Sequence, residues 1–182
     1  GGAVAVEAGG TKVGTAEPCQ PTEAEALVAF KDSLTSGADR LSSWSGEEVC
    51  SGSSTTWSGV TCSAEGKVFE INMWEQQLAG PLSAEWSVLT ALTNMRLRNI
   101  GYLDGTLPVQ WTAMQALQYL NLSTNNLDGT LPVQWSNMQA LQGLYLGNNN
   151  LDGTLPEQWS NMQALQSLNL GYSNGLDGTL PE

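Results

Sequence analysis

The sequence contains no histidine and few basic residues, and both absences exclude whole classes of function. Without histidine the chain cannot form a Ser-His-Asp or Cys-His catalytic group, a histidine-ligated zinc site or a histidine pH switch. Only 6 Lys and Arg residues oppose 18 Asp and Glu residues, which leaves a formal charge of −12. This imbalance argues against binding to nucleic acid or to anionic membrane surfaces, because both select clustered basic side chains.

Long apolar runs are also missing, since none approaches the roughly 18 residues that a membrane helix needs. We therefore expect no direct membrane insertion by these residues. The chain starts at Gly1 without a Met or a signal-peptide pattern, so we expect a processed or partial product. Its 182 residues allow one domain, or one extended repeat array, with a real core.

What the sequence does contain is an internal repeat. The string Leu-Asp-Gly-Thr-Leu-Pro begins at Leu103, Leu127, Leu151 and Leu176, at spacings of 24, 24 and 25 residues. A looser copy begins at Leu78, 25 residues before the first. A Leu-x-x-Leu-x-Leu segment precedes the copies and alternates apolar and polar residues, as a strand with one buried face does. One such unit cannot bury its own apolar face, so the pattern predicts a solenoid of stacked units.

The full unit reads Leu-x-x-Leu-x-Leu-x-x-Asn-x-Leu, followed by x-Gly-x-Leu-Pro-x-x-Trp-x-x-Met. From Val68 to Glu182 this closely resembles the leucine-rich repeat family, and the Gly-x-Leu-Pro segment resembles its plant-type subclass. The Thr-Leu-Pro-x-x-Trp version is similar to the kinetoplastid promastigote surface antigens. The resemblance implies an α/β repeat fold, a right-handed leucine-rich repeat solenoid with a parallel strand face and a helical N-terminal cap.

The segment before the repeats resembles that cap. Thr22-Glu-Ala-Glu25 is a capping box, which predicts a helix with Thr22 as its N-cap. Leu41-Ser-Ser-Trp44 and Cys50…Trp57-Ser-Gly-Val-Thr-Cys62 are similar to the cap of plant-type leucine-rich repeat proteins, which shields the first coil from water.

The predicted organisation is a flexible leader at residues 1–20, a cap at 21–66 and about five repeats at 67–182. The chain stops in mid-repeat at Glu182, so we expect the native polypeptide to be longer.

The family resemblance implies a disulfide between Cys50 and Cys62, and the alternative is two reduced buried thiols. A disulfide would place the chain in an oxidising compartment, so we predict a secreted or extracellular cell-surface protein. Cys19 is then left over, which suggests an intermolecular disulfide or a partner outside these residues. The only N-glycosylation sequon starts at Asn121, where a glycan would obstruct part of the strand face, and its use stays open.

Leucine-rich repeat proteins usually bind partners with the strand face, so the resemblance directs attention to its outward positions. Five of these carry aromatic or basic side chains: Trp74, Arg96, Arg98, Tyr119 and Tyr145. We predict that they form a contact patch for a protein or glycan partner. The alternative is that they are ordinary strand-forming residues. No basic residue follows Arg98, so a partner that docks beyond it is expected to be neutral or basic.

Three further columns recur with the repeat. The tryptophan column is expected to fill the core with the methionines beside it, not to stack on carbohydrate, and comprises Trp86, Trp111, Trp135 and Trp159. The aspartate column is expected to stack at roughly 5 Å per coil and could collect Ca²⁺, although solvent-facing turn residues are the favoured interpretation. Its members are Asp104, Asp128, Asp152 and Asp177. The threonine column could order water as an ice-binding surface, and comprises Thr106, Thr130, Thr154 and Thr179.

We predict a non-enzymatic module, without a cofactor or a metal site, that binds a protein or glycan partner through its strand face. The competing class is a structural component of an extracellular coat, wall or filament, assembled through the array. The units from Leu103 onward are nearly identical, which favours this alternative because recognition faces tend to diversify. Ice binding through the threonine column is the third and weakest candidate, since each coil carries only one Thr.

Overall fold

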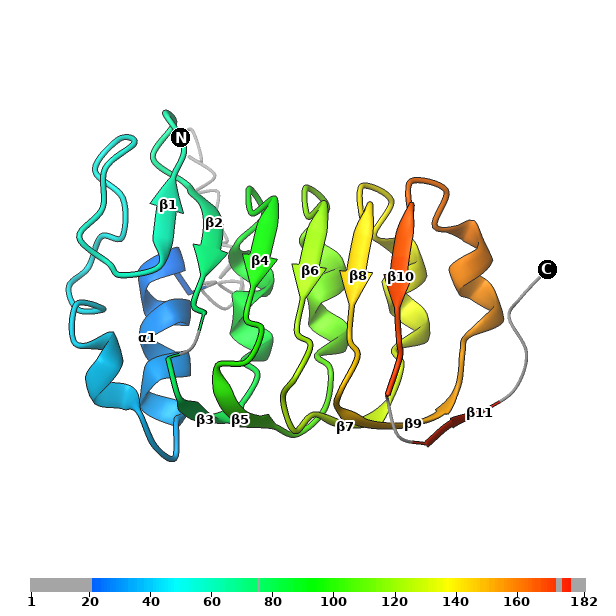
Figure 1. Cartoon of the computed structure of the whole chain (residues 1–182). Coiled ribbons are helices and arrows are strands. Elements are labelled where there is room, and N and C mark those ends of the chain that lie inside the picture. The colour runs from blue at the N-terminus through cyan, green and yellow to red at the C-terminus, as the bar shows by residue number, and fades with distance from the viewer. Residues whose placement is uncertain (1–20, 75, 173–174, 178–182) are drawn as a thin grey trace, which may run out of the picture.

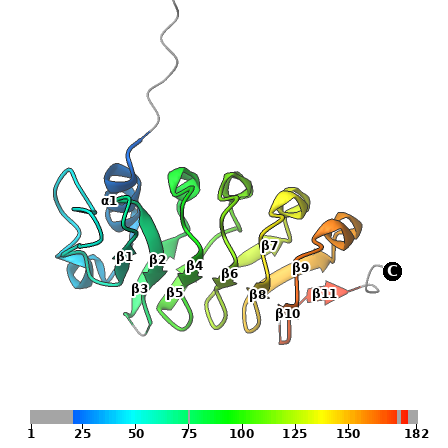
Figure 2. The ribbon, with the colours of Figure 1, turned by 90° about the horizontal axis from the view of Figure 1, so that it is seen from above.

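The computed structural model describes residues 21–74, 76–172 and 175–177. The chain forms a row of stacked coils behind a helical cap (Figure 1). Seen from above, the helical segments lie along one side of the row and the strands along the other (Figure 2). The predicted leucine-rich repeat solenoid with a parallel strand face is confirmed. The proposed leader and Cys19 lie outside the described residues, and so does the final Glu182.

The cap begins with α1 (Glu23–Ser33), and the predicted capping box is present at its start. The Glu25 N–H donates to Thr22 Oγ1 at 3.2 Å, and the Thr22 N–H donates to the Glu25 carboxylate at 2.7 Å. A 3₁₀ helix, η1 (Ala38–Leu41), follows α1. Phe30 on the buried face of α1 packs on Trp86 of the first coil, with ring centroids 4.7 Å apart. The cap therefore covers the first coil, as the sequence predicted.

The main sheet has six strands and runs the length of the array (Figure 1). Its first strand pairs antiparallel with the second, and all later pairs are parallel. In spatial order the strands are β1 (Val60–Cys62), β2 (Val68–Asn72), β4 (Asn94–Arg96), β6 (Tyr119–Asn121), β8 (Gly143–Tyr145) and β10 (Ser167–Asn169). The middle residues of β4, β6 and β8 point inward, and these residues, Met95, Leu120 and Leu144, are fully buried. The residues on either side of them therefore face outward.

A second set of short strands follows the main-sheet strands along the lower edge in Figure 1. One sheet contains β3 (Leu78–Pro81) and β5 (Gly101–Asp104), and the other contains β7 (Asp128–Thr130), β9 (Asn150–Thr154) and β11 (Gly175–Asp177).

The register of these strands corrects one expectation about the aspartate column. Asp128 pairs with Asn150, and Asp152 pairs with Thr130. Carboxylates of successive coils are therefore displaced by two residues, about 6.6 Å along the strand. The expected stack of carboxylates at about 5 Å is wrong, because the coils are offset along these strands.

The opposite side of the array is built from 3₁₀ helices: η2 (Ala84–Val88), η3 (Val109–Ala113), η4 (Val133–Asn137) and η5 (Glu157–Asn161). Each holds one tryptophan of the column, and the exposed fraction of these side chains does not exceed 5%. Neighbouring indoles are parallel within 8°, with ring centroids 6.2–6.4 Å apart. The methionines of the same units are also buried. The expectation that both columns fill the core is confirmed.

The indole N–H groups connect one coil to the next. Trp111, Trp135 and Trp159 donate to the carbonyls of Ser83, Pro108 and Pro132, each in the preceding coil, at 2.8–3.0 Å. The indole N–H of Trp86 has no hydrogen-bond partner among the described residues. Trp86 belongs to the first coil and meets the ring of Phe30 from the cap instead.

The side chains of the repeat asparagines bond to backbone groups of their own coil and of the preceding coil. The Asn149 amide donates to the carbonyls of Leu122 and Leu146 and accepts the Leu127 N–H. Asn125 donates to Leu97 and Leu122. The third asparagine of this set, Asn174, lies outside the described residues. These bonds satisfy backbone groups that would otherwise be buried without partners between coils.

Candidate functional site

The two tyrosines predicted for the strand face meet over a single glycine. Tyr119 of β6 lies opposite Gly143 of β8 in the parallel register, and Tyr145 follows two residues later. A Cβ atom at Gly143 would lie 2.9 Å from the Tyr119 ring and 3.0 Å from the Tyr145 ring. Because Gly143 has no side chain, the rings of Tyr119 and Tyr145 both lie close to its backbone.

Tyr119 is fixed further by a polar contact. Its hydroxyl forms a 3.0 Å hydrogen bond with Oε1 of Gln142, which immediately precedes β8. The Tyr119 side chain is 39% exposed and that of Tyr145 is partly exposed. The result is a held pair of aromatic rings with accessible surface, here called the tyrosine pair.

Arg96 is placed on the same face but is not a free cation. Its guanidinium forms an ion pair with Glu70 of β2 and donates to Asn94 Oδ1 at 3.3 Å. An exposed pair of this kind contributes about 1 kcal/mol or less to stability. Its effect is to hold the planar guanidinium against the sheet, with part of its charge compensated.

Trp74 and Arg98 form a separate group at the end of the strands. Both line a hollow of about 270 Å³ together with Asn99 and Thr124. The Trp74 side chain is 62% exposed. Of the five residues predicted as one patch, the structure brings Tyr119 together with Tyr145 and Trp74 together with Arg98, while Arg96 contacts Glu70.

The sequon asparagine lies in the centre of this face. Asn121 pairs with Arg96 on one side and with Tyr145 on the other. Its Oδ1 accepts hydrogen bonds from the backbone N–H and the hydroxyl of Ser123, at 3.1 and 2.7 Å. A glycan on Asn121 would therefore stand beside the tyrosine pair, and whether the sequon is used stays a prediction.

Sequence reasoning missed three residues that shape this face. Gly143 and Glu70 occupy outward positions of the strands and Gln142 immediately precedes β8, but none of them belongs to the predicted patch. The missing information is the register between coils, which pairs residues about 24 positions apart. Counting one repeat length from Tyr119 leads to Gly143, so the repeat itself was the available signal.

The cap contains the disulfide that the family resemblance implied, since Cys50 and Cys62 are joined. Nearby, Glu23 accepts the Val68 N–H at 3.1 Å and so connects α1 to β2. Burial raises the pKa of Glu23, and the Val68 hydrogen bond and the charge of Lys67 oppose that rise. This carboxylate therefore serves the junction between the cap and the first coil.

The described part of the chain lacks two other kinds of feature. No group of three or more Cys, Asp or Glu residues is arranged there to hold a metal ion. No helix in residues 21–74, 76–172 and 175–177 is both long and apolar enough to cross a bilayer.

Comparisons with known proteins agree with this architecture. The leucine rich repeat N-terminal domain matches residues 20–63, and the leucine rich repeat family matches residues 115–176. In the crystal structure of the BIR3–SERK2 complex from Arabidopsis thaliana, one chain is 32% identical with a TM-score of 0.76. That match covers 86% of this chain and 84% of the matched one.

Two curated relatives are similar over part of their length. Polygalacturonase inhibitor 1 of Oryza sativa subsp. japonica is 32% identical over 110 residues, which are 60% of this chain and 32% of the inhibitor. The leucine-rich repeat receptor-like serine/threonine-protein kinase RGI4 of Arabidopsis thaliana is 32% identical over 103 residues, 56% of this chain and 9% of the kinase. The matched region thus spans a third or less of either curated relative. None of these relatives is kinetoplastid, so that narrower resemblance stays a prediction. The chain belongs to the leucine-rich repeat family, with plant-type repeats behind the N-terminal cap domain of that family.

Proposed function

We propose that this chain is an extracellular, non-catalytic module that binds a protein partner through its strand face. The observation that carries the proposal is the tyrosine pair converging over Gly143. Tyr and Arg dominate the energetically important positions of protein interfaces, because they combine a large contact area with hydrogen bonding. Tyr119 is already held by Gln142, so less side-chain freedom is lost when a partner binds.

The relatives support a protein as the partner class. BIR3 and SERK2 form a complex with each other, and the rice relative is an inhibitor of a polygalacturonase, which is an enzyme. The disulfide in the cap supports an extracellular location, because disulfides persist in oxidising compartments.

The charge distribution of the chain indicates the charge expected on the partner's surface. No basic residue follows Arg98 in the sequence, and Arg96 is compensated by Glu70. A partner surface that meets the tyrosine pair is therefore expected to be neutral or basic.

The test is a binding comparison between two faces of the same chain. Secreted and cell-surface proteins of the source organism would be screened, and the dissociation constant of a captured protein measured by surface plasmon resonance. The double substitution Tyr119→Ala/Tyr145→Ala should weaken binding at least about tenfold, equivalent to about 1.4 kcal/mol. The matched control, Val109→Ala/Val133→Ala, removes exposed side chains from the opposite side and should change binding less than about twofold. Equal losses from both pairs would contradict the proposal.

The structural alternative remains a second candidate because the units from Leu103 onward are nearly identical. Light scattering over a concentration series separates the two classes. A constant monomer mass supports recognition, while a mass that grows with concentration supports assembly.

Ice binding is disfavoured by the register of the second sheet. Thr106 lies opposite Asp128, and Thr130 lies opposite Asp152. Threonines and carboxylates therefore alternate across this face, which is unlike an unbroken row of Thr. A thermal hysteresis assay would detect ice binding directly.

A further inference from the structure

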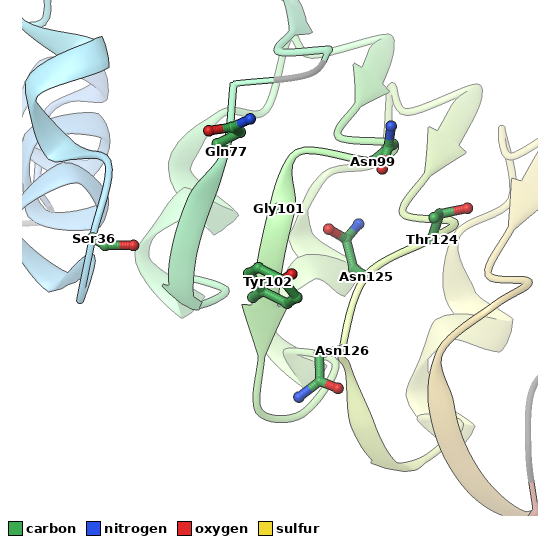
Figure 3. Close-up of a pocket in the computed structure, with 8 residues that line it drawn as sticks. All are labelled: Ser36, Gln77, Asn99, Gly101, Tyr102, Thr124, Asn125 and Asn126. Atoms are coloured by element: carbon green, nitrogen blue, oxygen red, sulfur yellow. The ribbon is translucent and has the colours of Figure 1, made fainter.

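A second hollow lies at the edge of the array, where the main-sheet strands turn into the second set of strands. It has a volume of about 880 Å³, within the range of small-molecule sites. Figure 3 shows the residues that line it: Ser36, Gln77, Asn99, Gly101, Tyr102, Thr124, Asn125 and Asn126. They come from the segment after α1 in the cap and from three successive coils. This hollow is here called the edge groove.

The edge groove coincides with a one-residue insertion. Six positions separate Leu97 from Leu103, whereas five separate Leu122 from Leu127 in the next coil. The longer turn ends in β5, where Gly101 has a φ of 127° and approaches the backbone of Leu78. A Cβ at Gly101 would lie 2.4 Å from the Leu78 carbonyl oxygen, so the turn depends on glycine at this position.

The insertion leaves Tyr102 projecting into the groove. In the register Tyr102 lies beside Ala79, which in turn lies beside Ser36. Ala79 and Ser36 are small, so neither covers the ring, and the side chain of Tyr102 is 75% exposed. An aromatic ring with one accessible face and small neighbours is a stacking platform for an apolar ring face.

The other lining groups are neutral and bear hydrogen-bonding amides or hydroxyls. None of the eight residues carries a charge. The side chains of Gln77 and Asn99 are exposed and bond to no other described residue, so their amides are available as donors and acceptors. Asn126 Oδ1 is held by the Asn150 amide at 2.7 Å, which fixes the far wall.

One residue in the lining of the edge groove has a buried hydrogen-bond acceptor without a partner. Asn125 Oδ1 is enclosed and has no hydrogen-bond partner among the described residues. One coil later, the equivalent oxygen of Asn149 accepts the Leu127 N–H from a preceding coil without the insertion, whereas the coil that precedes Asn125 carries it. Burying an unpaired acceptor costs about 1–3 kcal/mol, so a small shift that exposes this oxygen to a hydroxyl donor would be favourable.

The edge groove also continues toward the strand face. It shares Asn99 and Thr124 with the hollow lined by Trp74 and Arg98. Two exposed aromatic side chains, Tyr102 and Trp74, therefore line adjoining hollows that share the amide of Asn99 and the hydroxyl of Thr124.

We propose that the edge groove binds a neutral oligosaccharide, with one sugar ring stacked on Tyr102 and its hydroxyls bonded to the amides of Gln77, Asn99 and Asn126. Sugar rings present an apolar face and an edge of hydroxyls that both donate and accept, which matches an aromatic platform surrounded by amides. The absence of charge in the lining disfavours acidic sugars, and the net charge of −12 opposes them further. This site is separate from the tyrosine pair and does not depend on the proposed protein partner.

The test is isothermal titration of the full chain with cellohexaose, chitohexaose and a protein-borne high-mannose N-glycan. Free wall-type oligosaccharides and a protein-borne glycan share the same chemistry, and the separate titrations distinguish these sources. At least one ligand should bind with a dissociation constant below about 1 mM, an affinity within reach of one small site. An oligogalacturonide and an uncharged hydrophilic peptide complete the panel and should both bind more weakly.

Substitutions then assign the site. Tyr102→Ala should weaken binding of the best ligand at least tenfold, and Tyr102→Phe should retain most of it. The matched control is Tyr172→Ala, which removes an 87% exposed tyrosine from the turn after β10. It should change binding less than twofold, as should Tyr119→Ala/Tyr145→Ala on the strand face. The proposal is overturned if no neutral sugar binds at this level, if only the peptide binds, or if Tyr102→Ala and Tyr172→Ala have equal effects.

Discussion

The tryptophan column and the strand face follow the same 24-residue repeat, yet they use it in opposite ways. Every described coil places the same residue type in the column, and its indoles are buried and parallel within 8°. The positions equivalent to Tyr119 are Glu70, Asn94, Gly143 and Ser167, all different. The same residue type in every unit allows the indoles to stack, because each ring needs a matching neighbour. Different residue types at the outward strand positions create local features such as the tyrosine pair.

The largest expected effect on stability comes from removing one indole from the tryptophan column. Trp135→Ala removes a fully buried indole together with its hydrogen bond to the Pro108 carbonyl. We expect a loss of about 3–5 kcal/mol in the free energy of unfolding, measured by urea denaturation. Val133→Ala, in the same 3₁₀ helix but 45% exposed, should cost less than about 1 kcal/mol. Similar losses for the two variants would mean that the column is not the scaffold.

The asparagines allow a finer comparison within the interior. Asn149→Ala removes three hydrogen bonds to backbone groups, whereas Asn125→Ala removes only donor contacts because its Oδ1 is unpaired. We expect Asn149→Ala to lower the free energy of unfolding by about 2–3 kcal/mol, and Asn125→Ala by about 1 kcal/mol less. The same denaturation series measures both, and a larger loss at Asn125 would refute this account of the insertion.

The strand face should tolerate change without loss of stability. Tyr145→Ala is expected to alter the free energy of unfolding by less than about 1 kcal/mol, because the side chain is partly exposed and no core packs against its outer face. The adjacent Leu144→Ala, which is fully buried, should cost about 2–5 kcal/mol. If Tyr145→Ala were as costly as Leu144→Ala, the face would be part of the scaffold and the contrast would disappear.

The smallest expected effect is a pH dependence at the junction of the cap with the array. Burial raises the pKa of Glu23, so the folded chain binds this proton more tightly than the unfolded chain does. Its contribution is fully present below the unfolded pKa of about 4.3 and is lost as the pH rises through the higher folded value. The stability of the wild type relative to Glu23→Gln should therefore fall between pH 4 and pH 7 in urea denaturation.

Glu65 provides a control of opposite sign. A hydrogen bond from Ser63 lowers the pKa of Glu65, so its contribution is present above the unfolded pKa and is lost as the pH falls. The stability of the wild type relative to Glu65→Gln should rise, not fall, as the pH increases toward the unfolded pKa of about 4.3, and should stay level above it. Shifts of the same sign for both variants would contradict the opposite pKa directions of Glu23 and Glu65.

The repeat predicted the architecture and the roles of its recurring residues. The buried Trp and Met columns and the paired amide of Asn149 follow from one unit, because each is a local pattern multiplied by stacking, and the capping box follows from the local sequence at Thr22–Glu25. The register of the second set of strands did not follow. Stacking by one repeat length would place Asp beside Asp, but a two-residue offset places Asp152 beside Thr130.

Features that depend on the difference between coils were harder to predict. The repeat spacing of 25 residues before Leu103 was visible in the sequence, but its consequence was not. One extra residue unpairs Asn125 Oδ1 and exposes Tyr102 only because a particular pair of coils meets there. The tyrosine pair likewise depends on Gly143, whose importance lies in the neighbouring coil.

Site-specific crosslinking tests the central claim most directly. A photoreactive phenylalanine analogue would replace Tyr145 on the strand face or Val133 on the opposite side, and the captured protein partner would be irradiated with each variant. The account predicts a covalent adduct from position 145 and none from position 133. An adduct from position 133 without one from position 145 would show that the partner binds the helical side and would contradict the account.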